Sequence, residues 1–263
     1  MKIVSFNIGM KIDNSKEVAR LLKEQDPDII CLQEVIRHLS DSAYHKFQSK
    51  AIIDKYLDRT YRYRFFGPQW ISRAVYKHGK LHRDYGGLVE QGNYILSKYP
   101  IVEATNEHYF KHYSLEIDHT NFENIDHPRS VAIATLKIKG KKLTIFNLHG
   151  TYSTRKGDTP RSIAQAKYIV KRAKEFKNPL ILIGDFNVTP DTKTMKIINR
   201  EFDNIMNHFP VTQTLPYFKG KKDNKMIVDY VLTNKKVRAI NFQVYRSNIS
   251  DHLPLIFDFA IKQ

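Results

Sequence analysis

An apolar run that ends in two polar residues is the feature that most constrains the fold of this chain. Residues 180–184 carry no charge and lie between Pro179 and Pro190. An unbroken run of this length is typical of a strand covered on both faces. Asp185 and Asn187 follow it and, two apart on an extended chain, would point the same way. Such a pair is costly to place outside a functional site, although a strand followed by an Asx turn also explains it.

Two apolar strands flank a predicted helix at the start of the chain. Residues 2–8 and 28–32 are apolar enough for buried strands, and Asn14 between them offers a helix N-cap. A strand–helix–strand unit of about thirty residues implies a right-handed parallel crossover. Its two strand ends then deliver Asn7 and Glu34 to the same edge of a sheet.

The middle of the chain is less regular. Residues 42–60 favour a helix, whereas residues 61–92 read as irregular and mix Arg and Lys with Tyr, Phe and Trp. Basic side chains among aromatic rings suit phosphate contact plus base stacking; packing of alternate rings against a core explains residues 61–66 as well. His108 and His112 are spaced like zinc ligands on a helix, but no Glu follows the first His and no helical period supports a helix there. We therefore predict no zinc site in this segment.

Further strands are expected in the second half of the chain. Thr159 and Pro160 give the N-cap and first turn of a helix that ends near residue 174. With no internal repeat and no linker, residues 1–263 are expected to form a single domain. The remaining predicted strands are residues 93–97, 130–138, 142–148, 226–232, 239–245 and 255–260.

Charge and cysteine content bear on partners and compartment. The net charge of +16 favours a polyanionic partner, nucleic acid first and an anionic membrane surface second; solubility in a basic proteome explains it too. Cys31 is the only cysteine, which excludes an internal disulfide and fits a reducing compartment. No apolar signal region and no apolar window near 18 residues is found, so we expect a cytoplasmic monomer without stable membrane insertion.

Polar residues that could carry chemistry gather at the ends of the predicted strands. Each could be a cap or a surface group if taken alone. Solvation does not explain why all of them adjoin apolar strands. They are Asn7, Glu34, Asn147 with His149, Asp185 with Asn187, Asp251 with His252, and Asp229 within a further apolar strand.

The motifs FNI, LQEV, NLHG, GDFN, VDY and SDHLP resemble those of the endonuclease/exonuclease/phosphatase superfamily of metal-dependent phosphoesterases. They follow the family's order from residue 5 to residue 254, and GDFN and SDHLP are the most specific. The resemblance implies an α/β fold, a four-layer sandwich of two mixed, mainly antiparallel sheets packed face to face with helices outside. It also implies a site at one end of the sheets that binds Mg²⁺ or Mn²⁺.

The resemblance assigns metal-binding and histidine roles to five residues. Glu34 would be the main metal ligand, with Asn7 nearby and Asp251 as a candidate for the same ion or a second one. Mg²⁺ prefers oxygen ligands and keeps several waters, so one or two carboxylates suffice. His252 would act as a base or bind the phosphate, and Asp229 would fix its tautomer by hydrogen bonding.

The remaining implied roles concern water and phosphate. Asp185 would orient or deprotonate the attacking water, and Asn187 would hold a non-bridging oxygen. His149 would contact the phosphate or protonate the leaving group, and the choice of acid and base stays open. Three arginines are candidates for binding the phosphate, and a surface role explains Arg129 equally well. These candidates are Arg129, Arg155 and Arg161.

One departure from the family narrows the expected activity. Members that cut at abasic sites typically carry a tyrosine at the position of His149, so this activity is not expected. His149 instead resembles deoxyribonucleases, sphingomyelinases, deadenylases and tyrosyl-DNA phosphodiesterases. We therefore expect a Mg²⁺-dependent hydrolase of phosphodiester bonds, a nuclease acting on DNA or RNA. The alternatives are a phosphatase or a sphingomyelinase-like phospholipid phosphodiesterase on the same fold, and an inactive basic nucleic-acid-binding module.

Overall fold

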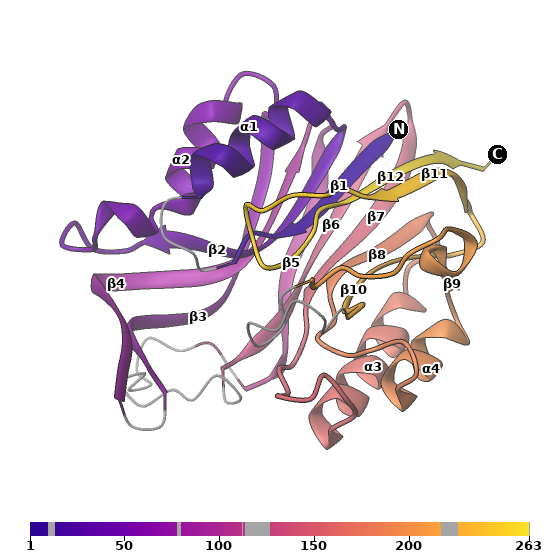
Figure 1. Cartoon of the computed structure of the whole chain (residues 1–263). Coiled ribbons are helices and arrows are strands. Elements are labelled where there is room, and N and C mark those ends of the chain that lie inside the picture. The colour runs from indigo at the N-terminus through magenta and orange to yellow at the C-terminus, as the bar shows by residue number, and fades with distance from the viewer. Residues whose placement is uncertain (10–13, 78–79, 112, 114–126, 217–225, 263) are drawn as a thin grey trace.

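Two six-stranded sheets pack face to face in the computed structural model, which describes residues 1–9, 14–77, 80–111, 113, 127–216 and 226–262 (Figure 1). The first sheet has the order β11 (Val237–Val244), β12 (Leu255–Ile261), β1 (Lys2–Asn7), β2 (Ile29–His38), β4 (Lys80–Ser97) and β3 (Tyr63–Lys77). The second has the order β5 (Ile101–Phe110), β6 (Arg129–Ile138), β7 (Lys141–His149), β8 (Leu180–Asp185), β10 (Asp229–Thr233) and β9 (Asp203–Asn204).

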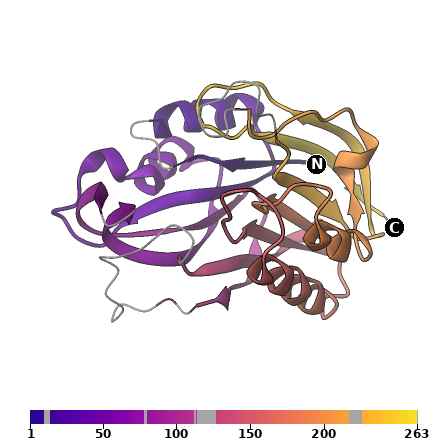
Figure 2. The same cartoon turned by 60° about the horizontal axis from the view of Figure 1, so that its bottom comes forward.

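Helices cover the outer face of each sheet. Helices α1 (Ser15–Gln25) and α2 (Ser49–Leu57) lie on the first sheet, and α3 (Pro160–Ala173) and α4 (Lys193–Asn199) lie on the second (Figure 2). The sheets are mixed, because β1 pairs with β2 and β7 pairs with β8 in parallel while the other pairs are antiparallel. The predicted four-layer α/β sandwich is therefore confirmed. No helix among the described residues is long and apolar enough to cross a membrane.

The alternation of side chains along the strands builds the layers. Ile3 and Cys31 point between the two sheets, whereas Val4 and Ile30 point outward to the helices. Each of these side chains is fully buried, and burial of an aliphatic side chain contributes about 1.5–3 kcal/mol. Burial also raises the pKa of the Cys31 thiol, as is usual for a buried structural cysteine.

The segment predicted to be irregular, residues 61–92, is mostly a long antiparallel hairpin of β3 and β4. Its register shifts three times, between Pro68 and Trp70, between Ser72 and Ala74, and between Val75 and Tyr76. Each bulge reverses the side-chain alternation, which hides the strand period in the sequence.

Several aromatic rings of residues 61–92 are buried. Tyr61 and Trp70 are each only 1% exposed, so the base-stacking prediction is wrong for these two rings. The nearby basic side chains of Arg62 and Arg73 are exposed. The core-packing alternative therefore explains the buried rings.

The helix starts follow the predictions in part. Thr159 caps α3 through a capping box with Ser162, as its sequence predicts. Asn14 instead donates from Nδ2 to the carbonyls of Ile8 and Ile249, at 2.7 and 3.0 Å, and makes no side-chain cap for α1. This contact ties the end of β1 to the loop that carries Asp251 and His252. Of the helix expected over residues 42–60, the structure forms a 3₁₀ turn, η1 (His45–Phe47), and α2.

Strands β7 and β8 approach so closely at Gly184 that no side chain fits there. Replacement of Gly184 is therefore expected to destabilise the protein strongly. It has φ of +134°, and a Cβ there would lie 2.1 Å from the Leu148 carbonyl oxygen of β7. We expect Gly184→Ala to lower the free energy of unfolding by about 3 kcal/mol or more, because both backbone strain and a clash arise. Urea denaturation measures this loss.

The matched control is Gly157→Ala, where a Cβ would meet nothing within 4 Å. We expect this change to alter the free energy of unfolding by less than about 0.5 kcal/mol. Equal stabilities of the two variants would contradict the strand geometry described here.

Candidate active site

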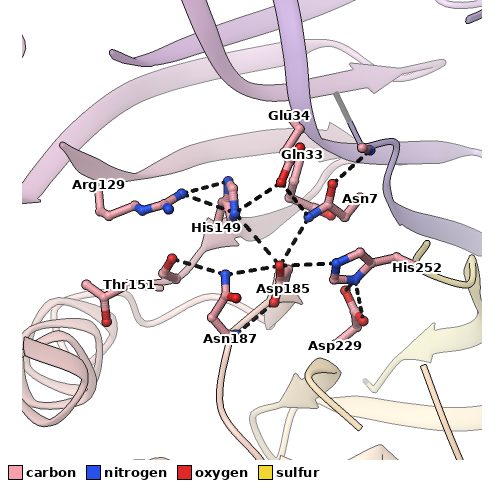
Figure 3. A network of polar contacts seen from close by, with 12 residues as sticks. Asn7, Gln33, Glu34, Arg129, His149, Thr151, Asp185, Asn187, Asp229 and His252 are labelled. Carbon is pink, nitrogen blue, oxygen red and sulfur yellow. Dashed lines mark hydrogen bonds and ion pairs between the residues drawn. The ribbon is translucent and has the colours of Figure 1, made fainter. Parts of the chain in front are cut away.

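Side chains from both sheets converge on a pocket of about 120 Å³ at one end of the sandwich (Figure 3). Asn7 and Asp229 lie directly behind the pocket, hydrogen-bonded to its lining residues. The structure brings most of the predicted site residues together at this pocket. The predicted residues that line the pocket are Glu34, Arg129, His149, Asp185, Asn187, Asp251 and His252.

Glu34 reaches the pocket through a bulge in β2. The register of β2 against β4 shifts between Leu32 and Val35, and Glu34 has φ of +61°. A non-glycine residue in this region costs on the order of 1 kcal/mol and is typical of a functional site. Asn147 holds the bulge from the other sheet, because its Nδ2 donates to the Leu32 carbonyl at 3.0 Å. Asn147 is thus a buried structural residue.

Asn7 ties the two central carboxylates together. Its Nδ2 lies 3.3 Å from Glu34 Oε1 and 3.1 Å from Asp185 Oδ2. Its Oδ1 accepts a hydrogen bond from the Gly9 amide at 3.0 Å. Asn7 therefore lies beside Glu34 as predicted, but it presents N–H groups to the carboxylates and turns its carbonyl oxygen to the backbone.

Asp185 and Asn187 form an Asx turn and are also part of the site. The Asn187 amide donates to Asp185 Oδ1 at 2.7 Å, and Asn187 Nδ2 donates to Asp185 Oδ2 at 3.1 Å. Asn187 has φ of +58°, so the expected extended chain is wrong and the convergence arises from the turn. The Asx-turn explanation is therefore correct, and the same two residues also belong to the candidate site.

His252 and Asp229 form a buried pair. His252 Nδ1 lies 2.9 Å from Asp229 Oδ2, as predicted for an orienting carboxylate. Burial alone would lower the pKa of His252, but the carboxylates of Asp229 and Asp185 outweigh it and raise this pKa to about 10. These carboxylates favour the imidazolium form of His252, and its Nε2 faces Asp185 Oδ2 at 3.8 Å.

His149 has the opposite electrostatic environment. Burial and then the Arg129 guanidinium hold the pKa of His149 well below its usual value, so the imidazole is neutral. Gln69 sets its tautomer: Gln69 Nε2 donates to the carbonyls of Ser130 and His149, which turns Oε1 toward His149 Nδ1 at 3.1 Å.

With its proton on Nδ1, His149 has an unprotonated Nε2 that can accept a hydrogen bond from Arg129 NH1 at 3.1 Å. The Nε2 atom lies 3.7 Å from Glu34 Oε1 and 3.8 Å from Asp185 Oδ2. The two histidines thus have opposite surroundings: carboxylates raise the pKa of His252, whereas burial and a guanidinium lower the pKa of His149. Gln69 was not singled out from the sequence, since it lies within the hairpin that was read as irregular.

The candidate arginines divide into one inside the pocket and two outside it. Arg129 is buried, and its NH1 lies 3.1 Å from His149 Nε2, which can accept from it, and 3.0 Å from Nδ1. Arg155 is exposed, and Arg161 lies over the ring of Phe110 at 4.5 Å. The structure therefore does not bring Arg155 and Arg161 to the pocket.

Several pocket residues escaped the sequence reasoning. Lys156 is 4% exposed and donates from Nζ to Asn187 Oδ1. His127 is buried and packs against Trp70, with ring centroids 5.0 Å apart. Only the position of Lys156, in the basic loop after the NLHG motif, offered a hint. His108 lies on strand β5 and not on a helix. His112 lies outside the described residues.

The oxygen donors of the pocket fit a hard divalent cation. Burial raises the pKa of Glu34, and the neighbouring Asp251 carboxylate raises it further. Two carboxylates that repel each other in a buried site are the donors that Mg²⁺ or Mn²⁺ would neutralise. Asp185, Asp229 and His252 also offer ligand atoms within 4.8 Å of one another. His252 Nδ1 and Asp229 are hydrogen-bonded to each other at 2.9 Å, so Glu34 and Asp251 are the better ligands.

Comparison with known proteins places this arrangement in context. The model of the endonuclease/exonuclease/phosphatase family matches residues 4–252. No curated protein matches the sequence.

Similar solved structures share the fold at low sequence identity. A family protein from Bacteroides vulgatus has a TM-score of 0.73 at 17% identity, covering 99% of this chain and 98% of that one. Mannosyl-6-phosphatase Bt3783 of Bacteroides thetaiotaomicron has a TM-score of 0.70 at 15% identity, covering 99% and 100%. Truncated TDP2 of Caenorhabditis elegans has a TM-score of 0.64 at 19% identity, covering 98% and 96%.

Proposed function

This chain belongs to the endonuclease/exonuclease/phosphatase family, and from that premise we propose that it hydrolyses phosphodiester bonds of nucleic acid with a divalent cation, Mg²⁺ or Mn²⁺. Enzymes of the family hydrolyse phosphate esters. The observation that carries the proposal is the convergence of Glu34, Asp185 and two unlike histidines on one pocket.

The cation has a defined place in this proposal. Glu34 and Asp251 would hold it at the pocket. When bound, it supplies positive charge to the phosphate oxygens and makes a water more acidic. Asn7 keeps Glu34 and Asp185 at a fixed separation by donating to both.

Asp185 and His149 are suited to prepare the attacking water. Asp185 is held by donors on both carboxylate oxygens, from the Asn187 amide and from two side-chain amides. This fixes the direction in which it can accept a hydrogen bond from a water. Asp185 would accept the proton of that water, and His149 Nε2 lies beside it, 3.8 Å from Asp185 Oδ2.

His252 is suited to the opposite task. Its imidazolium carries a proton on Nε2 and a partner carboxylate on Nδ1. It can neutralise a non-bridging phosphate oxygen and give its proton to the departing oxygen. Asp229 keeps the ring in this orientation and stabilises its charge.

The net charge supports a polyanionic substrate. Lys and Arg outnumber Asp and Glu by 43 to 27, which favours association with nucleic acid through its phosphates. A phosphomonoester is the second candidate, because the pocket is small and contains the cationic side chains of Arg129 and Lys156, which suit a dianionic phosphoryl group. A mannosyl-6-phosphatase shares this fold.

A substrate panel tests the proposal. We expect plasmid DNA or oligonucleotides, together with bis(p-nitrophenyl) phosphate, to be hydrolysed with Mg²⁺ or Mn²⁺ and spared in EDTA. p-Nitrophenyl phosphate, mannose 6-phosphate and sphingomyelin should react at least about 100-fold more slowly than nucleic acid, because the strongly basic chain attracts a polyanion. The Asp185→Asn variant serves as the inactive control. Faster turnover of a monoester or of sphingomyelin than of any nucleic acid would select the alternative activity.

A further inference from the structure

Gln91 is a buried residue of β4 that lines the pocket. It pairs with Ile36 of β2 on one side and with Trp70 of β3 on the other, so its backbone is held between two strands. The residue is 2% exposed. Its neighbour Glu90 is engaged elsewhere, by Arg37 Nε at 2.6 Å. Strand β4 thus contributes the carboxamide of Gln91 to the wall of the pocket.

The Gln91 carboxamide has no hydrogen-bond partner in the described part of the chain. Buried polar side chains are normally hydrogen-bonded, because an amide that loses water without gaining a partner destabilises the fold. Gln69, in the bulge of β3 that faces Gln91, shows the normal case. Its carboxamide bonds to the carbonyls of Ser130 and His149 and to the His149 ring. A buried amide that the fold leaves unpaired, aimed into a pocket, indicates a partner from outside the chain.

The asparagines at the pocket have their N–H groups committed to the protein. Asn7 Nδ2 donates to two carboxylates. Asn187 Nδ2 donates to Asp185 Oδ2 at 3.1 Å and to the Gly150 carbonyl at 3.3 Å, which uses both of its hydrogens. In this arrangement neither asparagine has a hydrogen to offer a substrate oxygen. Gln91 is therefore the pocket carboxamide that can donate to a ligand.

The size and charge of the pocket define what Gln91 can contact. Pockets that hold a drug-sized ligand measure roughly 300–1,000 Å³, whereas this one measures about 120 Å³. That volume suits a phosphoryl group and is too small for a nucleoside. The guanidinium of Arg129 also lines the pocket and favours an anion there. The group that reaches Gln91 is accordingly the phosphate, with the sugar or base outside.

We propose that Gln91 binds the substrate by donating a hydrogen bond from Nε2 to an oxygen of the phosphate. The inference rests on the proposed phosphoesterase function and adds a phosphate-binding group on the first sheet. A neutral donor suits this wall of the pocket, because the carboxylates of Glu34 and Asp251 line it as well. A lysine or arginine beside them would form ion pairs and compete with the cation, whereas an amide leaves both carboxylates available.

Two substitutions of Gln91 test the direction of this hydrogen bond. Gln91→Met removes the amide at similar size and should lower kcat/KM for bis(p-nitrophenyl) phosphate about 100-fold, because a donor to the transition state is lost. Gln91→Glu keeps the shape but replaces the donor with a carboxylate that repels phosphate, so its kcat/KM should be lower still. The control Gln243→Met, at an exposed glutamine of β11, should stay within about threefold of wild type. Unchanged kcat/KM in Gln91→Met, or a Gln91→Glu variant as active as wild type, would overturn the proposal.

Thermal unfolding without substrate separates substrate binding from a structural role. Gln91→Met should melt at or above the temperature of wild type, because an apolar side chain replaces a buried amide that has no partner in the protein. Gln69→Met removes a glutamine that does have protein partners and should melt several degrees lower. A comparable loss of stability in Gln91→Met would show that its amide supports the fold, which contradicts the proposal.

Binding of inorganic phosphate tests the inference apart from catalysis. Calorimetry in the presence of Mg²⁺ should show phosphate affinity about threefold to tenfold weaker in Gln91→Met than in wild type, since one neutral hydrogen bond is lost. This difference is expected even if wild type fails to hydrolyse nucleic acid, which would count against the proposed function alone. Equal affinities, or no phosphate binding by wild type, would overturn the role of Gln91.

Discussion

Replacing Glu34 with alanine is expected to reduce kcat/KM for a phosphodiester by at least about 10³-fold while leaving the protein folded. Glu34 is the carboxylate that the β2 bulge projects into the pocket. Burial and Asp251 raise its pKa, so its charge is held at a cost to stability. We therefore expect the melting temperature of Glu34→Ala to equal or exceed that of wild type without metal. Hydrolysis assays and thermal unfolding in EDTA measure the two effects.

Glu24 provides the matched control for Glu34. It is an exposed glutamate of α1, so Glu24→Ala should change kcat/KM by less than about twofold. Near-normal activity of Glu34→Ala would show that the reaction does not need the Glu34 carboxylate. A severe loss of stability would instead show that the charge is structural.

The buried pair of His252 and Asp229 gives the second large effect. We expect His252→Ala to lower kcat/KM by about 10³-fold and Asp229→Asn by about 10²-fold, because the proton donor and then its orientation are lost. The double variant should be no worse than His252→Ala, since Asp229 acts through the ring. Kinetics of the three variants with bis(p-nitrophenyl) phosphate measure this.

An exposed pair of the same chemistry serves as control. His208 Nε2 lies 2.6 Å from Asp203 Oδ1, and both side chains are more than half exposed. His208→Ala and Asp203→Asn should leave kcat/KM within about twofold of wild type. Additive losses in the Asp229 and His252 variants would mean that the two residues act independently, contrary to the geometry.

The strands that carry the site could be predicted because each is an apolar run that ends in a polar motif. Residues 180–184 and the run before Glu34 show this most clearly, and the parallel pairing of β1 with β2 followed from the short helix between them. A strand that is buried on both faces needs apolar residues throughout, so it can be recognised from a short stretch of sequence. The resemblance of the motifs then indicated that the ends meet in one site.

The bulges and turns that aim the side chains could not be predicted. The positive φ of Glu34 and of Asn187 depends on contacts from distant segments, such as Asn147 on Leu32. The hairpin of β3 and β4 was missed because its bulges interrupt the alternation. Tertiary contacts override local pattern in each of these places.

Partners far apart in the sequence were missed for a related reason. Gln69 reaches His149 across 80 positions, and Lys156 reaches Asn187 across 31. Neither residue belongs to a recognisable motif, so nothing in the local sequence distinguishes it from other polar residues. The electrostatic contrast between the two histidines therefore emerges only from the structure.

Binding of Mn²⁺ to wild type and to Glu34→Ala, compared by calorimetry at neutral pH, tests the central claim most directly. If the carboxylates of this pocket hold the cation that hydrolysis needs, wild type should bind Mn²⁺ and the variant should bind it at least about tenfold more weakly. Equal Mn²⁺ affinity in the two proteins, with hydrolysis persisting in EDTA, would contradict a metal-dependent site at Glu34.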